Sequence, residues 1–83
     1  MNTRLVAHVH RMALRDALTF RSWSYDDLAR AAGVSKGTVS NLANGTRTHT
    51  TPETAVKIAR AVGVDRQDLF TLKPATRASH PAA

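Results

Sequence analysis

At 83 residues the chain suffices for one small domain, which buries about 60% of the surface that the unfolded chain exposes. It contains no cysteine, which excludes disulfides and thiolate metal sites, and neither a membrane span nor an N-terminal secretion signal is predicted. Twelve Lys and Arg residues against six Asp and Glu give a net charge of +6, which favours a polyanionic partner. A small basic binding module is therefore expected, and not an enzyme with a deep pocket.

The spacing of apolar residues predicts helices throughout the chain. These residues recur every three or four positions, and runs that alternate apolar and polar β-branched residues are missing. The first helix is expected over residues 4–21, with one stripe through Leu14 and Leu18 and a second through Val9 and Met12. The sequence leaves open which stripe faces the core. His10 lies on the first stripe and is expected to be partly buried.

Two short helices follow, separated by a tight break. Ser24 is a good N-cap for a helix over residues 25–32, and acidic residues in its first turn suit the helix macrodipole. Gly33 ends this helix, as glycine does where the backbone needs a positive φ. Ser35 is a second N-cap, and the helix over residues 36–43 ends at Asn44.

Two more helices are expected after residue 51, and the residues after Leu72 lack any periodic pattern. Thr51 followed by Pro52 is a strong start signal for a helix over residues 52–62. A fifth helix is expected over residues 66–70. We therefore predict an all-α, compact five-helix domain over residues 1–72, and a disordered basic tail over residues 73–83.

The pair of helices over residues 25–43 is the part of the chain with the clearest functional meaning. Helices joined by so few residues must cross steeply, and a small residue such as Ala29 is needed where they touch. Behind them, an apolar wedge is expected from Leu28, Val34, Val39 and Leu42. This spacing is that of a helix-turn-helix, whose second helix enters the major groove of DNA.

Residues 23–45 resemble the helix-turn-helix of the phage repressor and Cro-like family, of the lambda repressor-like fold. Ala29, Gly33, Val39 and the Asn44-Gly45 pair stand at the family's diagnostic spacings, and the similarity extends over about residues 5–72. One departure is Tyr25, which stands where members often carry a glutamine that contacts a DNA phosphate. The resemblance implies a sequence-specific regulator of transcription in the cytoplasm of a bacterial cell, binding a (pseudo)palindromic operator as a dimer.

Two sets of residues are candidates for contact with double-stranded DNA. The exposed side of the third helix is expected to read base edges, through Lys36, Gly37, Thr38, Ser40 and Asn41. Similarity to the family implies phosphate contacts from Tyr25, Ser35, Asn44, Thr46 and Arg47. No acidic residue lies between Asp27 and Glu53, so this surface does not repel phosphate.

The dimer is expected to be weak and to assemble on DNA, because little chain remains for a subunit interface. Leu69, Phe70 and Leu72 form the only clear apolar surface expected outside the core. The 83-residue length resembles a Cro-type repressor more than a two-domain repressor. An antitoxin whose basic tail folds on a toxin is an alternative, and so is a protein-interaction module of the same fold without DNA binding.

Other kinds of site have little support in the sequence. The four histidines include His8 and His10, which are two positions apart and would face different sides of a helix, so we expect no metal site. His49, in the loop, is expected to approach the DNA backbone at low pH. Trp23 is expected to pack beneath the helix pair. We find no catalytic constellation and no phosphate-binding glycine loop, and therefore expect no enzyme and no cofactor.

Overall fold

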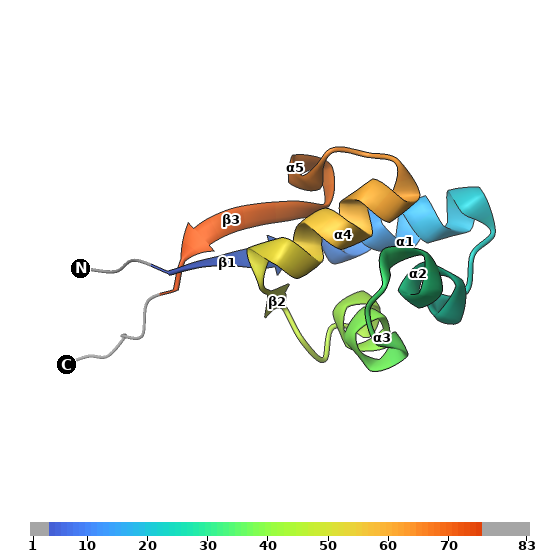
Figure 1. Cartoon of the computed structure of the whole chain (residues 1–83), viewed down its shortest axis with the longest axis horizontal. Coiled ribbons are helices and arrows are strands. Elements are labelled where there is room, and N and C mark those ends of the chain that lie inside the picture. Colours follow the sequence, from blue (N-terminus) through green and yellow to red (C-terminus); the bar gives the residue numbers. More distant parts are fainter. Residues whose placement is uncertain (1–3, 76–83) are drawn as a thin grey trace.

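Five helices enclose the core in the computed structural model, which describes residues 4–75 (Figure 1). They are α1 (Arg11–Arg21), α2 (Tyr25–Ala32), α3 (Lys36–Asn44), α4 (Pro52–Val62) and α5 (Arg66–Leu69). The number of helices and the start of the last four agree with the sequence prediction. The fifth ends at Leu69, one residue earlier than expected.

The predicted N-caps start their helices through side-chain hydrogen bonds. The Ser24 hydroxyl accepts the backbone N–H of Asp27, and the Asp27 carboxylate accepts the backbone N–H of Ser24, at 3.1 and 2.9 Å. This reciprocal pair is a capping box. The bonds from Ser24 lower the pKa of the Asp27 carboxyl below its ordinary value. Thr51 begins α4 in the same way, with its hydroxyl accepting the N–H of Thr54.

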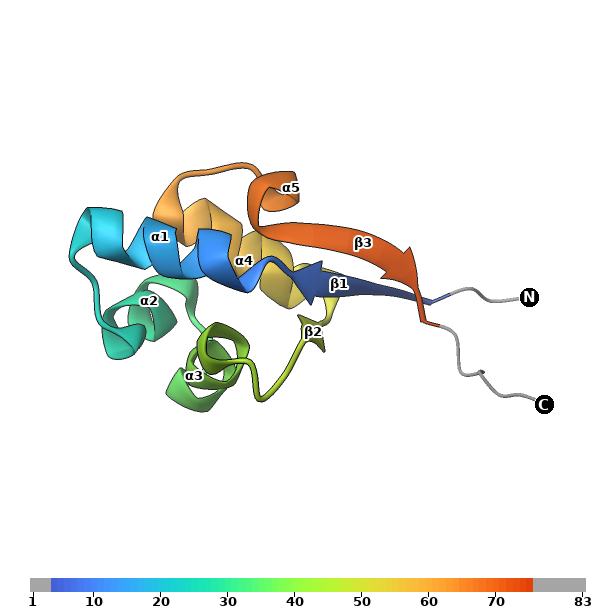
Figure 2. The same ribbon diagram turned by 180° about the vertical axis from the view of Figure 1, so that it is seen from behind.

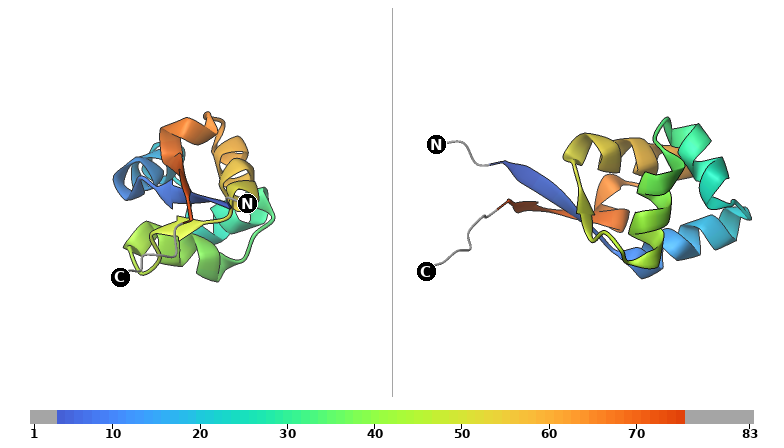
Figure 3. Two further views of the ribbon diagram at one scale, coloured as in Figure 1. Left: turned by 90° about the vertical axis from the view of Figure 1, so that its left-hand side faces the viewer. Right: turned by 90° about the horizontal axis from the view of Figure 1, so that it is seen from below.

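The prediction of an all-α fold is wrong, because three short strands form a sheet beside the helices. These are β1 (Leu5–Val9), β2 (His49–Thr50) and β3 (Phe70–Pro74), in the antiparallel order β2-β1-β3. β1 and β3 lie side by side and run away from the helices toward the two ends of the chain, as seen in Figure 2 and in the right view of Figure 3. The sheet lengthens the molecule to 45 Å along its longest axis.

The first helix is therefore shorter than predicted, starting at Arg11 instead of residue 4. The strand β1 occupies the first part of the expected helix, and its ladder to β3 pairs Ala7 with Leu72. Two backbone hydrogen bonds hold the end of β1. The N–H of Val9 donates to the carbonyl of Thr48, and the N–H of His10 donates to the carbonyl of Leu69. Pairing with segments distant in sequence thus outweighs the local helical spacing.

β3 also passes the expected domain boundary. Lys73 and Pro74 belong to the strand, where Lys73 is opposite Val6 and Pro74 is opposite Leu5. The sheet accordingly continues two residues past the end that we predicted for the folded domain. The rest of the predicted tail, residues 76–83, lies outside the described residues.

The core combines helices α1 to α5 with one face of the sheet. Its largest fully buried side chains include Leu14 from α1, Leu28 from α2, Leu42 from α3, Ile58 from α4 and Phe70 from β3. The stripe of α1 through Leu14 and Leu18 faces inward, and Met12 from the other stripe is exposed.

The burial of several side chains differs from the sequence prediction, and that of Trp23 agrees with it. Leu69 and Phe70 are 2% and 0% exposed, so they belong to the core and offer no surface for a dimer, and Leu72 is half-buried against the core. His10 is exposed instead of partly buried, because it lies just before α1, and its Nε2 is 2.7 Å from the Thr71 hydroxyl. Trp23 is half-buried against the core, as expected, and the guanidinium of Arg21 lies 5.3 Å from its ring centroid.

The outer face of the sheet carries a pair of histidines on neighbouring strands. His8 on β1 is opposite His49 on β2, with 5.5 Å between ring centroids. Partial burial lowers the pKa of His8 below its ordinary value of 6.5, and the nearby positive charge of Lys73 and the ring of His49 lower it further.

We expect the free energy of unfolding to decrease as the pH is lowered through 6.5 toward the depressed pKa of His8. In that interval the unfolded chain binds more protons at this residue than the folded chain does, so acid favours unfolding. Urea unfolding at a series of pH values between 8 and 5, for the unaltered chain and for His8→Gln, measures the effect. The variant should show a flatter dependence, and an unchanged slope would contradict this assignment.

Candidate nucleic-acid interface

The helices α2 and α3 form the predicted pair, with a tight reversal between them. Gly33 has a φ of 74°, a left-handed conformation that glycine adopts without steric strain, and its N–H donates to the carbonyl of Ala29. Leu28, Val39 and Leu42 are fully buried behind the pair, as the apolar wedge predicted, and Val34 is half-buried against them. The core thereby fixes the position of α3 from behind.

The polar side of α3 is not covered by another element of the described chain. In the right view of Figure 3, which shows the molecule from below, α3 lies in front of the other helices. Lys36 and Gly37 are exposed, and Thr38, Ser40 and Asn41 are half-buried on the same helix. All five predicted base-reading residues are therefore brought together on α3. Their contact with bases remains a prediction.

Ser35 at the start of α3 already has a structural role. Its hydroxyl accepts the backbone N–H of Thr38 at 3.1 Å and lies 2.8 Å from the Thr38 hydroxyl. The hydrogen bond holds the first turn of α3 and directs the Thr38 methyl group by fixing its hydroxyl. A phosphate contact from Ser35 would have to be made in addition to this cap.

The predicted phosphate-binding loop after α3 is held by hydrogen bonds to α3 itself. The side-chain oxygen of Asn44 accepts the N–H of Thr46 at 2.9 Å, and its amide nitrogen donates to Ser40 at 3.4 Å. The N–H of Arg47 donates to the carbonyl of Asn41 at 3.0 Å. The loop conformation is thus set before any ligand binds, while the side chains of Thr46 and Arg47 are exposed.

Tyr25 is separated from this loop. It is half-buried at the start of α2, in a hollow that it shares with Arg15 and Trp23, whereas Thr46 and Arg47 line a different hollow. The structure therefore does not join Tyr25 to the other predicted phosphate ligands of the loop.

Acidic groups around α3 are few and engaged elsewhere. Within residues 4–75 the one ion pair joins Asp26 and Arg30, at 2.6 Å on the exposed side of α2. Asp27 is engaged in the capping box. No acidic residue lies on α3 or in the loop after it. The charge of this surface therefore favours a polyanion.

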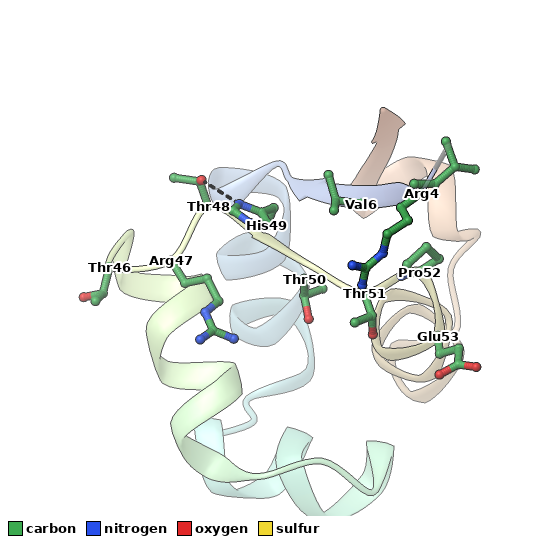
Figure 4. Close-up of a pocket in the computed structure, with 11 residues that line it drawn as sticks. Arg4, Val6, Thr46, Arg47, Thr48, His49, Thr50, Thr51, Pro52 and Glu53 are labelled. Atoms are coloured by element: carbon green, nitrogen blue, oxygen red, sulfur yellow. Dashed lines mark hydrogen bonds between the residues drawn. The ribbon is translucent and has the colours of Figure 1, made fainter. Parts of the chain in front are cut away.

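A groove that the sequence did not predict lies beside the loop. We call it the threonine groove; it has a volume of about 850 Å³ and is lined by Arg4, Leu5, Val6 and residues 46–53, among them Thr46, Thr48, Thr50 and Thr51 (Figure 4). The four threonines between α3 and α4 are visible in the sequence and indicate a polar surface there. The presence of Arg4 in this groove could not be predicted, because the sequence analysis placed this residue at the start of a helix.

No three His, Asp or Glu side chains among residues 4–75 gather as a metal site would require. No helix in this range combines the length and apolar character needed to cross a membrane.

The comparison with known families agrees with this geometry. A family model described as helix-turn-helix matches residues 14–69, which is more than half of the chain and includes α2, α3 and α4. Such domains bind DNA and are typically not enzymes. No curated protein and no solved structure matches the chain at a significant level.

Proposed function

Because the chain belongs to the helix-turn-helix family of the XRE, Cro and CI type, we propose that it regulates transcription by binding double-stranded DNA at specific sequences. The observation that carries this proposal is the uncovered polar side of α3, held out from the core by the wedge behind it. In this function α3 lies in the major groove, and its side chains contact base edges.

The proposed base contacts follow from the chemistry of each side chain. The ammonium group of Lys36 suits the O6 and N7 acceptors of guanine, and the amide of Asn41 suits the N6 and N7 groups of adenine. Thr38 offers a methyl group to thymine. The loop after α3 supplies phosphate contacts from Thr46 and Arg47, which set the register without reading sequence.

The finer proposal is a Cro-type repressor of a phage, prophage or bacterial gene, acting in the cytoplasm. It occupies a (pseudo)palindromic operator and excludes RNA polymerase. Two copies bind half-sites one turn of DNA apart, about 34 Å. Since Leu69 and Phe70 are buried, the pair forms weakly in solution and is completed on the DNA.

Selection of bound fragments from random duplex DNA tests the proposal. We expect a recurring half-site, present twice with two-fold symmetry, and a protein that sediments as a dimer on the selected duplex and mainly as a monomer without it. The logarithm of the binding constant should fall linearly with the logarithm of salt concentration, with a slope near −0.9 for each phosphate contact. Failure to retain any duplex at low salt would refute DNA binding, and a single unrepeated half-site would refute the symmetric dimer.

A further inference from the structure

The threonine groove places two arginines from distant parts of the chain around the same space. Arg4 directly precedes β1 and Arg47 lies in the loop after α3; in Figure 4 the Arg4 side chain reaches toward Thr51, the Arg47 side chain lies beside α3, and Thr50 is between them. Within residues 4–75 neither guanidinium takes part in an ion pair. Two guanidinium groups that line the same groove and have no ion-pair partner can each bind one phosphate of an extended polyanion.

The backbone around both arginines is fixed by the sheet. The carbonyl of Arg4 accepts the N–H of Ala75 at 2.7 Å, at the end of the β1–β3 ladder. On the other side, the carbonyl of Thr48 accepts the N–H of Val9. Strands β1 and β2 of one sheet thus line the groove, and hydrogen bonds next to both arginines set the backbone positions of these residues without a ligand.

The side chain of Thr50 is a second, independent sign of a ligand. Thr50 is only 8% exposed, and it is the single polar residue in the buried set of the described chain. Its hydroxyl makes no hydrogen bond within residues 4–75, and Figure 4 shows it between Arg4 and Arg47 at the groove. Leaving a buried hydroxyl without a partner costs about 1 to 3 kcal/mol in general, so such a group usually has a function.

The groove is continuous with the proposed DNA-binding surface, which indicates what its anion is. Arg47 is shared between the groove and the loop, and that loop follows directly after α3. A helix in the major groove has a sugar–phosphate backbone on each side of it, so an anion site at the end of α3 faces phosphates. The one acidic group lining the groove is Glu53, which works against an anion there.

We propose that the threonine groove binds the phosphate backbone of duplex DNA beyond the base pairs read by α3, with Arg4 and Arg47 holding the phosphates and Thr50 donating a hydrogen bond. This inference rests on the proposed function and deepens it. It makes the residue that precedes β1 a DNA contact and makes the protein's footprint longer than that of the α2–α3 pair alone.

Duplexes of two lengths test the inference. The shorter duplex ends at the last base pair of the selected half-site, on the side that faces the threonine groove. The longer duplex continues on that side for one further turn, about 10 base pairs. Arg4→Gln should lower the affinity for the longer duplex about tenfold and reduce its salt slope by about one, while leaving the affinity for the shorter duplex unchanged. Arg60→Gln, at an exposed position of α4 outside the groove, is the charge-matched control and should behave as the unaltered chain.

Two more variants separate binding from folding. Thr50→Val keeps the shape of the side chain and removes the hydroxyl, so it should bind the longer duplex about threefold more weakly while the fold is at least as stable as before. Glu53→Gln removes the opposing charge and should tighten binding of the longer duplex. Urea unfolding of each variant establishes that the fold is retained.

The outcomes distinguish this inference from the proposed function. If the unaltered chain binds no duplex, the proposed function fails. If it binds both duplexes equally and Arg4→Gln changes neither affinity, only the present inference fails. Two results together would also overturn the assignment to DNA. Inorganic phosphate alone would shift the amide resonances of Thr50 and Arg47, and the affinity for duplex DNA would not depend on duplex length.

Discussion

Replacing Phe70 by alanine is expected to lower the free energy of unfolding by about 4 kcal/mol. The side chain is fully buried where α5 passes into β3, within the cluster that joins the sheet to the helices. Truncation to alanine removes its burial and leaves a cavity that the close-packed neighbours fill only in part. A loss of this size is a large share of the roughly 5 to 15 kcal/mol that stabilises a small domain.

The control for this prediction is the other phenylalanine of the chain. Phe20 is 89% exposed on α1, so Phe20→Ala removes the same side chain without opening a cavity and should change stability by less than about 0.5 kcal/mol. Urea unfolding followed by circular dichroism compares the two variants. Equal losses would show that Phe70 is not part of the core.

The second large effect is expected in the DNA-binding specificity of α3. Asn41→Ala and Lys36→Ala should each reduce the preference for the selected half-site by about 1 to 3 kcal/mol, which is roughly 5- to 150-fold. Affinity for unrelated duplexes should fall much less, because phosphate contacts supply most non-specific binding. Arg47→Ala should weaken binding to specific and unrelated duplexes alike.

Fluorescence anisotropy with the selected duplex, with single-base variants of it and with an unrelated duplex measures these differences. The loss of preference should be confined to the base that faces the altered side chain. Uniform weakening by all three variants would contradict the division into base-reading and phosphate-binding residues. Each variant changes an exposed or half-buried position of α3 or its loop, so none is expected to unfold the domain.

The starts of α2 to α5 and the helix-turn-helix were predictable from sequence because their signals are local. The hydroxyls of Ser24 and Thr51 accept backbone N–H groups three residues further on, and Gly33 adopts a left-handed backbone conformation without strain. Each of these interactions lies within a few adjacent residues. The buried positions of α2 and α3 followed from the helical period in the same way. The family match over residues 14–69 agrees with this local reading.

The sheet could not be predicted because its strands are too short and too far apart in sequence. β2 has two residues, and β1 pairs with β3 more than sixty positions later. In β1 the sequence Leu5–Val9 fits a strand and a helix equally well, and only the available partners decide between them. For the same reason Leu69 and Phe70 were expected on the surface: their burial depends on what the sheet places beside them.

The sequence by itself thus determined the helical pair and the polar, acid-free side of α3, since capping, glycine conformation and charge act between near neighbours. Only the tertiary structure decided that residues 5–9 form a strand, that Phe70 lies in the core, that the polar side of α3 is left uncovered and that Arg4, Arg47 and Thr50 line one groove. Strand pairing joins segments whose sequences contain no sign of each other, and the threonine groove exists only where those segments meet.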